Sequence, residues 1–385
     1  MPPLVAGITV AAVAKFALTV AISLALSFIA RLLTPKPKGA QDRGLPLTIR
    51  SSIAPRQYVY GTTVVGGVLV FATLSGSTNQ YLHFVVALAG HEVAGIDSIF
   101  FDDVEIANGA LNGSGLVTTG RFANKVRVKK HLGADDQTAD SDLVSEVGVW
   151  TTTHRLRGIA YVYLRLEFDR DVFPAGIPEI RVGVRGRKLW DLRSDPSDSS
   201  IKAFTNNAAL CQLDYAMSTD GFNLTADKIH LASWAAAANI CDEPVELAAT
   251  GSPPLTEARY TCDGAFHLGV RRLDIMRDLM NATLGAVVWQ QGQLRGYAAA
   301  ATAANPTALT VDDLRDGISV VTRPSRDQLF NRVRGTYIDA EHHYIPTSFA
   351  PVTNVAYLAE DNDDPIWQDM TLDFTTGHAR AQRMA

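Results

Sequence analysis

The residue types that could carry acid–base chemistry gather in one short stretch, where apolar runs end. They are His91, Glu92, Asp97, Asp102 and Asp103. A histidine and a carboxylate within hydrogen-bonding reach of a substrate could act as general base and acid, but turns attract polar residues of this kind as well. No nucleophile elbow, zinc-protease helix, phosphate-binding loop, kinase or deaminase signature accompanies them. The sequence therefore predicts no catalytic residue and no enzyme.

Patterns for a metal or an organic cofactor are also missing. The chain has three cysteines, Cys211, Cys241 and Cys262. They lie far apart without C-x-x-C spacing, so we expect buried, reduced thiols instead of a zinc site or a disulfide scaffold. His342 and His343 have no third ligand at helical spacing. The acidic run 360–364 lacks the spacing of a calcium-binding loop, so we expect an exposed turn there and no metal or cofactor in the protein.

Two kinds of segment have compositions that occur in phosphate or nucleic-acid sites. The glycine-rich loop 108–120 lacks the G-K-[ST] ending of a nucleotide-binding loop, which argues against nucleotide binding. Val126–His131 and Arg181–Lys188 alternate apolar and basic residues, a pattern typical of strands with one charged face. Such a face suits solvent or a protein interface, and contact with DNA is the alternative. The net charge of −5 favours the first interpretation.

The secondary structure predicted to position these residues changes along the chain from strands to helices and back to strands. Short runs of valine, isoleucine, phenylalanine and tyrosine, cut by glycines, fill residues 53–104 and predict tightly turned strands. Helical patterns dominate residues 199–296. Helices are expected over 200–217, over 228–238 with an N-cap at 225–227, and over 274–284 with Gly285 as the C-terminal glycine. A hairpin is expected at 286–297 around Gln291–Gln293, strands at 318–321 and 333–337, and the start of a helix at 378–385.

Composition and these patterns together predict a globular, mixed α+β, β-rich protein of two or three domains. The chain has 385 residues, of which 47% are apolar and 19% charged, enough for a sizeable core. The expected divisions are an apolar N-terminal helix (1–34), a proline-rich linker (35–55), a β-rich domain (56–191), a helical or mixed domain (192–300) and a second β-rich domain (301–385).

The N-terminal segment Leu4–Leu33 is long enough to cross a bilayer as a helix. Its polar residues recur every four positions, at Lys15, Thr19, Ser23, Ser27 and Arg31. On a helix this spacing forms one stripe, through which neighbouring helices could approach and hydrogen-bond. A single membrane anchor is the alternative. The positive charges that follow the segment would then leave the rest of the chain in the cytoplasm.

Motifs spread over roughly residues 50–340 resemble, in their order, the hub-forming N-terminal part of the tail tip attachment protein J family of long-tailed, non-contractile bacteriophages. No single motif is decisive, but the shared order makes the resemblance specific. The matching segments are the stretch 53–104, Trp150 with His154, Gly158–Val162, Phe173–Pro178, Val184–Asp191, Asn206–Leu210, Ala236–Glu243, Arg259–Gly264 and Leu329–Val333.

The resemblance implies a structural virion protein at the tip of the tail, assembled in the host cytoplasm as a homotrimer around the tail axis. It implies a tail-hub architecture with small β-barrel tube domains over Arg56–Asp191 and about Leu309–Asp373. The implied partners are adjacent distal tail and hub proteins, the tape-measure protein, a central fibre and the host cell envelope. Phage DNA would pass through without sequence-specific binding.

The apolar helices of three copies are then expected to bundle on the tail axis, with the polar stripe facing the neighbouring helices or the axis. Proteins of this family generally continue into further hub and fibre domains, so the chain is expected to be a portion of a longer tip protein. The alternative function is a membrane-tethered bacterial enzyme or binding domain, which only the N-terminal segment favours.

Overall fold

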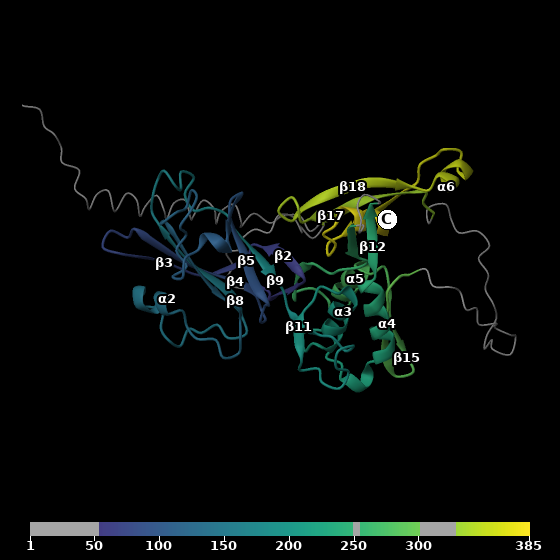
Figure 1. Cartoon of the computed structure of the whole chain (residues 1–385), viewed down its shortest axis with the longest axis horizontal. Coiled ribbons are helices and arrows are strands. Elements are labelled where there is room, and N and C mark those ends of the chain that lie inside the picture. The colour runs from purple at the N-terminus through teal and green to yellow at the C-terminus, as the bar shows by residue number, and fades with distance from the viewer. Residues whose placement is uncertain (1–53, 249–254, 301–328) are drawn as a thin grey trace, which may run out of the picture.

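Strands separated by glycines and turns make up most of the regular secondary structure of the described chain, as its β-branched runs predict. The computed structural model describes residues 54–248, 255–300 and 329–385. Figure 1 shows an elongated molecule with a β-rich unit at one end, helices in the middle and a second β-rich unit beside them. This arrangement confirms the mixed α+β, β-rich class expected from the sequence.

Two four-stranded antiparallel sheets form the first β-rich unit, with the orders β2-β9-β5-β6 and β3-β4-β8-β7. Their strands are β2 (Thr62–Val65), β3 (Val68–Ser75), β4 (Tyr81–Ala89), β5 (Gly95–Phe101), β6 (Val104–Ala107), β7 (Val126–His131), β8 (Ala160–Glu167) and β9 (Ile180–Arg185). Side chains from both sheets share one core, which includes Val86, Ile99, Leu164 and Val182. The sheets therefore pack face to face.

The β3-β4-β8-β7 sheet is covered on its other face too, and strand β8 shows how. Alternate side chains of a strand point to opposite faces. Val162 and Leu164 join the core between the two sheets, whereas Tyr161 and Tyr163 pack in a smaller cluster with residues of helix α2 (Ser141–Glu146). Covering both faces explains why β8 is buried along nearly its whole length.

The predicted barrel-like tube domains over Arg56–Asp191 and Leu309–Asp373 are wrong for the residues that the structure describes, because no sheet there closes on itself. A barrel needs every edge strand to hydrogen-bond the next strand around the ring. Here β2, β6, β3 and β7 end their sheets, and the two sheets meet through side chains instead of backbone bonds. The sheet that follows residue 328 has three strands and is open as well.

The first helix of the middle region, α3 (Ala208–Met217), starts later than the sequence predicts. Residues 202–204 form strand β11 (Lys202–Phe204), which pairs with β10 (Lys188–Trp190) and so cannot continue the helix. Asn207 caps α3, because its side chain accepts a hydrogen bond from the N–H of Leu210 at 3.2 Å. Pairing with a distant strand therefore overrides the local helical pattern.

The other two helices also differ from their predicted ranges. Residues 226–228 form a single 3-10 turn (η2), so helix α4 (Leu231–Asp242) is capped by His230 and not by Thr225. Helix α5 (Arg272–Asn281) begins earlier and ends earlier than predicted. Leu284 already has a positive φ of 47°, which a helix does not allow.

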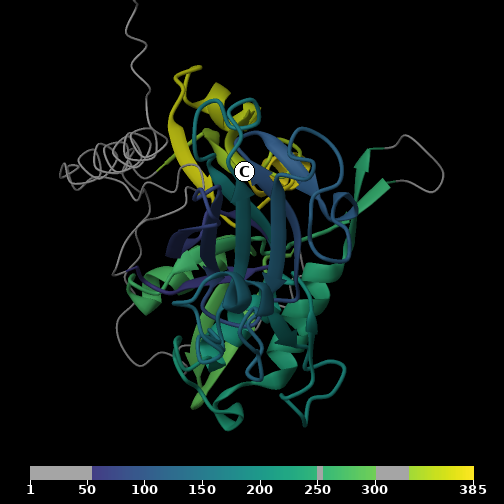
Figure 2. The ribbon, with the colours of Figure 1, turned by 90° about the vertical axis from the view of Figure 1, so that its left-hand side faces the viewer.

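The predicted hairpin is confirmed as β15 (Ala286–Gln290) paired with β16 (Gln293–Tyr297). Gln291 and Gly292 have φ values of 54° and 77°, and a two-residue hairpin turn of type I′ requires positive φ at both positions. Two more antiparallel pairs complete the middle region. They are β1 (Gln57–Tyr60) with β14 (Gly264–His267), and β12 (Pro244–Ala248) with β13 (Leu255–Ala258). The second pair projects away from the helices (Figure 2).

The C-terminal sheet has the order β18-β17-β19, with β17 antiparallel to β18 and parallel to β19. Its elements are β17 (Arg332–Asp339), β18 (Ile345–Thr353), helix α6 (Val355–Glu360), β19 (Trp367–Leu372) and helix α7 (His378–Met384). The predicted strand at 333–337 and helix near 378 are thereby confirmed. Phe349 and Phe374 share a core with Trp234 and Leu279 of the helical region, so these parts pack as one body.

Several predictions fall on residues outside the described ranges. They include the helix at 4–33 with its stripe (Lys15, Thr19, Ser23, Ser27, Arg31) and the strand at 318–321. Among the helices within the described ranges, none is long and apolar enough to cross a bilayer. The predicted domain boundaries stay predictions.

Candidate functional site

Three of the carboxylates considered for acid–base chemistry each pair with a different residue of the basic run 181–188. The pairs are Glu92 with Lys188 at 2.9 Å, Asp97 with Arg185 at 2.8 Å and Asp103 with Arg181 at 3.2 Å. Asp102 accepts a hydrogen bond from the N–H of Glu179 at 2.9 Å. The structure distributes these groups along strand β5 and the turns beside it, where each neutralises or orients a neighbour.

His91 is buried and holds two backbone segments together. Its Nε2 accepts a hydrogen bond from the N–H of Val59 at 3.0 Å, and its Nδ1 donates to the carbonyl oxygen of Glu92 at 2.7 Å. Burial lowers the pKa of His91 to about 4, and the nearby Arg187 and Arg56 guanidinium groups act in the same direction. His91 is therefore neutral near pH 7, and its two hydrogen bonds fix its orientation.

A buried polar cluster joins the first β-rich unit to the helical region. We call it the polar joint; its members are Arg187, Asp214, Tyr58 and Tyr60. Arg187 lies 3.3 Å from the Asp214 carboxylate and donates to the Tyr58 hydroxyl at 2.9 Å. Tyr60 donates to Asp214 at 2.8 Å. Burial alone would lower the pKa of Arg187, but Asp214 and the two tyrosines raise it.

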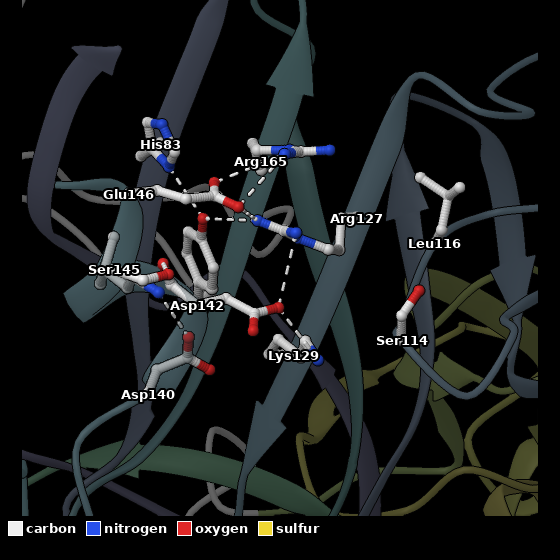
Figure 3. A network of polar contacts seen from close by, with 12 residues as sticks. His83, Ser114, Leu116, Arg127, Lys129, Asp140, Asp142, Ser145, Glu146 and Arg165 are labelled. Carbon is white, nitrogen blue, oxygen red and sulfur yellow. Dashed lines mark hydrogen bonds and ion pairs between the residues drawn. The ribbon is translucent and has the colours of Figure 1, made fainter. Parts of the chain in front are cut away.

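The basic strand β7 is neutralised by acidic residues of helix α2, as Figure 3 shows. Glu146 pairs with Arg127 and, at 3.3 Å, with Arg165 of β8. Asp142 lies 3.1 Å from Lys129 and 3.5 Å from Arg127. A cationic face whose charges are already paired within the chain has little left to attract phosphate groups. This geometry favours the interface interpretation of the strand over DNA contact.

Asp140 ties the start of α2 to the same strand. Its carboxylate caps α2 by accepting from the N–H of Leu143 at 2.8 Å and lies 2.8 Å from Nε2 of His131. Burial alone would raise the pKa of Asp140, but the hydrogen bonds from His131 and Leu143 hold it below its ordinary value. Asp140 is thus the residue that pins α2 to the sheet.

Replacing Asp140 with alanine should therefore detach α2 without unfolding the sheets. We expect the free energy of unfolding to fall by about 2 kcal/mol, because a helix cap and a charge-assisted hydrogen bond are lost together. Denaturant titration and limited proteolysis within 132–159 measure the effect. Asp142→Ala is the matched control; its partly exposed ion pairs should contribute below about 1 kcal/mol. Equal losses in the two variants would contradict the special role of Asp140.

The remaining candidates also have structural roles. In the loop 108–120, the side chain of Asn112 accepts hydrogen bonds from Ser114 and Leu116, so the backbone donors serve the loop itself. In the acidic run, Asp361 accepts a hydrogen bond from Asn331 at 2.8 Å. Across residues 54–248, 255–300 and 329–385, no three histidine, cysteine, aspartate or glutamate side chains are placed to hold a metal ion.

The three cysteines are buried as free thiols in one core, as the sequence predicts. Burial raises the pKa of the Cys241 thiol to about 12. Sequence reasoning missed the polar joint, because Arg187 looks like one more basic residue of a charged strand. Its partner Asp214 lies on a helix, and nothing local to either residue indicates the contact.

The C-terminal part of the chain is similar to a known protein family. A family model described as "Putative phage tail protein" matches residues 273–385. This match supports the interpretation of the chain as a phage tail protein. No curated protein matches the sequence.

A similar fold occurs in a solved structure described as "Virion of native gene transfer agent (GTA) particle". The TM-score is 0.56 and the identity 17%, over 95% of this chain and 82% of that chain. At this identity the likeness concerns the fold alone. The finer identification with the tail tip attachment protein J family stays a prediction.

Proposed function

We propose that this protein is a subunit of the hub at the tip of a long, non-contractile phage tail. Three copies surround the tail axis and close the tail tube before infection. The hub then takes part in host attachment and in opening the tube for DNA ejection. The role is mechanical, and we assign it no catalytic step.

Two similarities support this proposal, and they overlap along the chain. The J-like motifs run in order through roughly residues 50–340, and the match to the phage-tail family covers residues 273–385. The paired charges of the described chain support the same role. Ion pairs lock β7 to α2, and the polar joint links the first β-rich unit to the helices. Ion pairs that hold the units of one subunit together suit a subunit that must withstand mechanical force.

The partners in this proposal are the distal tail protein, other hub proteins, the tape-measure protein, a central fibre and the host envelope. DNA passes along the axis without sequence-specific contacts. The N-terminal segment Leu4–Leu33, which lies outside the described residues, is proposed to bundle on the axis in the trimer. Its stripe of Lys15, Thr19, Ser23, Ser27 and Arg31 would then face the neighbouring helices or the axis.

The oligomeric state of the purified full chain tests the proposal. We expect a homotrimer by mass photometry and threefold density for this chain in a tail-tip reconstruction, since oligomers of one chain are usually closed and symmetric. Sixfold occupancy in the tail would reject the hub assignment. A monomer that needs detergent to stay in solution would reject it in favour of a membrane-tethered enzyme or binding domain.

A further inference from the structure

Lys130 of strand β7 differs from the other lysines of the described ranges, because no carboxylate lies within 4.0 Å of its amine. Each of the others pairs with an aspartate or glutamate at that distance or closer; they are Lys125, Lys129, Lys188, Lys202 and Lys228. Proteins seldom withdraw a lysine from water without giving it a counter-charge. The surroundings of Lys130 therefore call for a different explanation.

The Lys130 side chain points into the space between the two sheets of the first β-rich unit. Alternate residues of a strand share a face, and Val126 and Val128 of β7 belong to the core between the sheets. The Nζ atom of Lys130 donates to the carbonyl oxygens of Ile96, at 2.8 Å, and Asp97, at 3.4 Å. Both carbonyls belong to β5 of the facing sheet, where a bulge interrupts the ladder with β9. The amine thus reaches from one sheet to the other.

The third group that contacts this amine is the side-chain amide of Asn108, through its Oδ1 atom. Asn108 follows β6 directly, and the pairing of Ser98 with Ala107 places it beside the bulge of β5. The amide carbon Cγ is bonded to Oδ1, so the contact holds the Lys130 nitrogen next to a carbon that an amine can attack. Two groups held at about 3–3.5 Å react as if each were present at a very high local concentration.

The environment of the pair favours attack by the amine. Burial lowers the pKa of Lys130, although the charge of Asp97 acts in the opposite direction. A lower pKa makes the neutral amine, which is the nucleophilic form, easier to reach. The Asp97 carboxylate is itself bound to Arg185 at 2.8 Å. Asn108 is exposed, so a nitrogen that leaves its side chain can pass directly into water.

We propose that Lys130 and Asn108 join in an isopeptide bond that links the two sheets covalently. The Nζ atom of Lys130 forms a bond to Cγ of Asn108, and the bond between Cγ and Nδ2 breaks. Of the three protons on the lysine ammonium group, one stays on the new amide and two go to the departing nitrogen, which leaves as an ammonium ion. The step consumes no oxidant, reductant or cofactor.

The bond would connect two sheet edges that backbone hydrogen bonds leave separate. Strand β7 ends one sheet and β6 ends the other, and the two sheets share only side-chain contacts. The segment between residues 108 and 130 would become a closed ring, which restricts the unfolded chain and so favours the folded state. The inference concerns a modification within one copy and does not depend on the proposed role in a tail hub.

Mass spectrometry of the purified full chain tests the bond. We expect the denatured chain to be lighter than its sequence by one ammonia, and a tryptic digest to contain a branched peptide that joins residues 108 and 130. Lys130→Arg keeps the positive charge but cannot form the amide, so it should restore the full mass, as should Asn108→Ala. Lys129→Arg is the matched control, because Lys129 points to the other face and pairs with Asp142 (Figure 3); its loss of ammonia should persist.

Two mass results would overturn the proposal. One is a wild-type chain that has the full mass of its sequence. The other is a loss of ammonia that survives in Lys130→Arg, because the backbone nitrogen of Gly109 can attack the same Asn108 side chain and release ammonia without any cross-link.

Cutting the ring gives a second test that does not depend on stability. A specific protease site inserted after Gly120 lies in an exposed turn, between the two linked residues. After cleavage and denaturation, the wild-type background should run as one covalently joined species, whereas the Lys130→Arg background should separate into two fragments. Two fragments from the wild-type background would show that the sheets are not linked and would overturn the proposal.

Discussion

Replacing Arg187 with alanine is expected to lower the free energy of unfolding by about 3–5 kcal/mol, because it leaves a buried carboxylate without its cation. The Asp214 side chain is only 8% exposed, and Arg187 is its close cationic partner at 3.3 Å. Lys202 lies farther away, at 4.0 Å, and compensates only in part. The Tyr58 hydroxyl loses a donor in the same variant. Denaturant unfolding measured by far-UV circular dichroism gives the change.

Arg185→Ala is the matched control for this experiment. Arg185 also pairs with a carboxylate, Asp97, but both side chains are more than a third exposed. Solvent screens such a pair, so its removal should lower the free energy of unfolding by less than about 1 kcal/mol. Adding Asp214→Ala to Arg187→Ala should recover part of the loss, because the unpaired charge is removed. If the two arginine variants lose equal stability, the polar joint does not hold the units together.

Acidification from about pH 6.5 to about pH 4 is expected to cost about 3 kcal/mol of stability through His91 alone. Burial lowers the pKa of His91 from its ordinary value of 6.5 to about 4. The unfolded chain therefore takes up a proton in this window while the folded chain does not, and stability falls as the pH falls. Above pH 6.5 the contribution is fully present. Facing charges include Arg187 and Arg56, which oppose protonation, and Asp220, which favours it.

His91→Gln separates this effect from the titration of other groups. The glutamine amide can still accept the hydrogen bond from Val59 but does not bind a proton in this range. We expect the difference in unfolding free energy between wild type and variant to shrink as the pH falls from 8 to 4.5. Burial also lowers the pKa of His83 and His267, which keep their contributions in both proteins and cancel. Parallel pH curves for the two proteins would rule out His91 as the sensitive group.

The order of strands and helices was predictable because it depends on neighbours in sequence. Runs of β-branched and aromatic residues became β3, β4 and β8. The glycine at 292 with a positive φ fixed the hairpin of β15 and β16 where it was expected. The boundary of α3 was not predictable from the same kind of signal. Its first predicted residues pair with β10, a partner that only the folded chain brings near.

The charged residues show most clearly which features depend on the local sequence and which depend on the tertiary structure. The sequence by itself determined that β7 alternates apolar and basic residues, that the cysteines are far apart and that no catalytic signature is present. Only the tertiary structure decided that α2 neutralises β7, that Arg187 meets Asp214 and that the sheets stay open. The physical reason is the separation along the sequence over which each effect acts. Propensity and periodicity act over a few residues, whereas ion pairs, shared cores and sheet edges join segments that chain folding alone brings together.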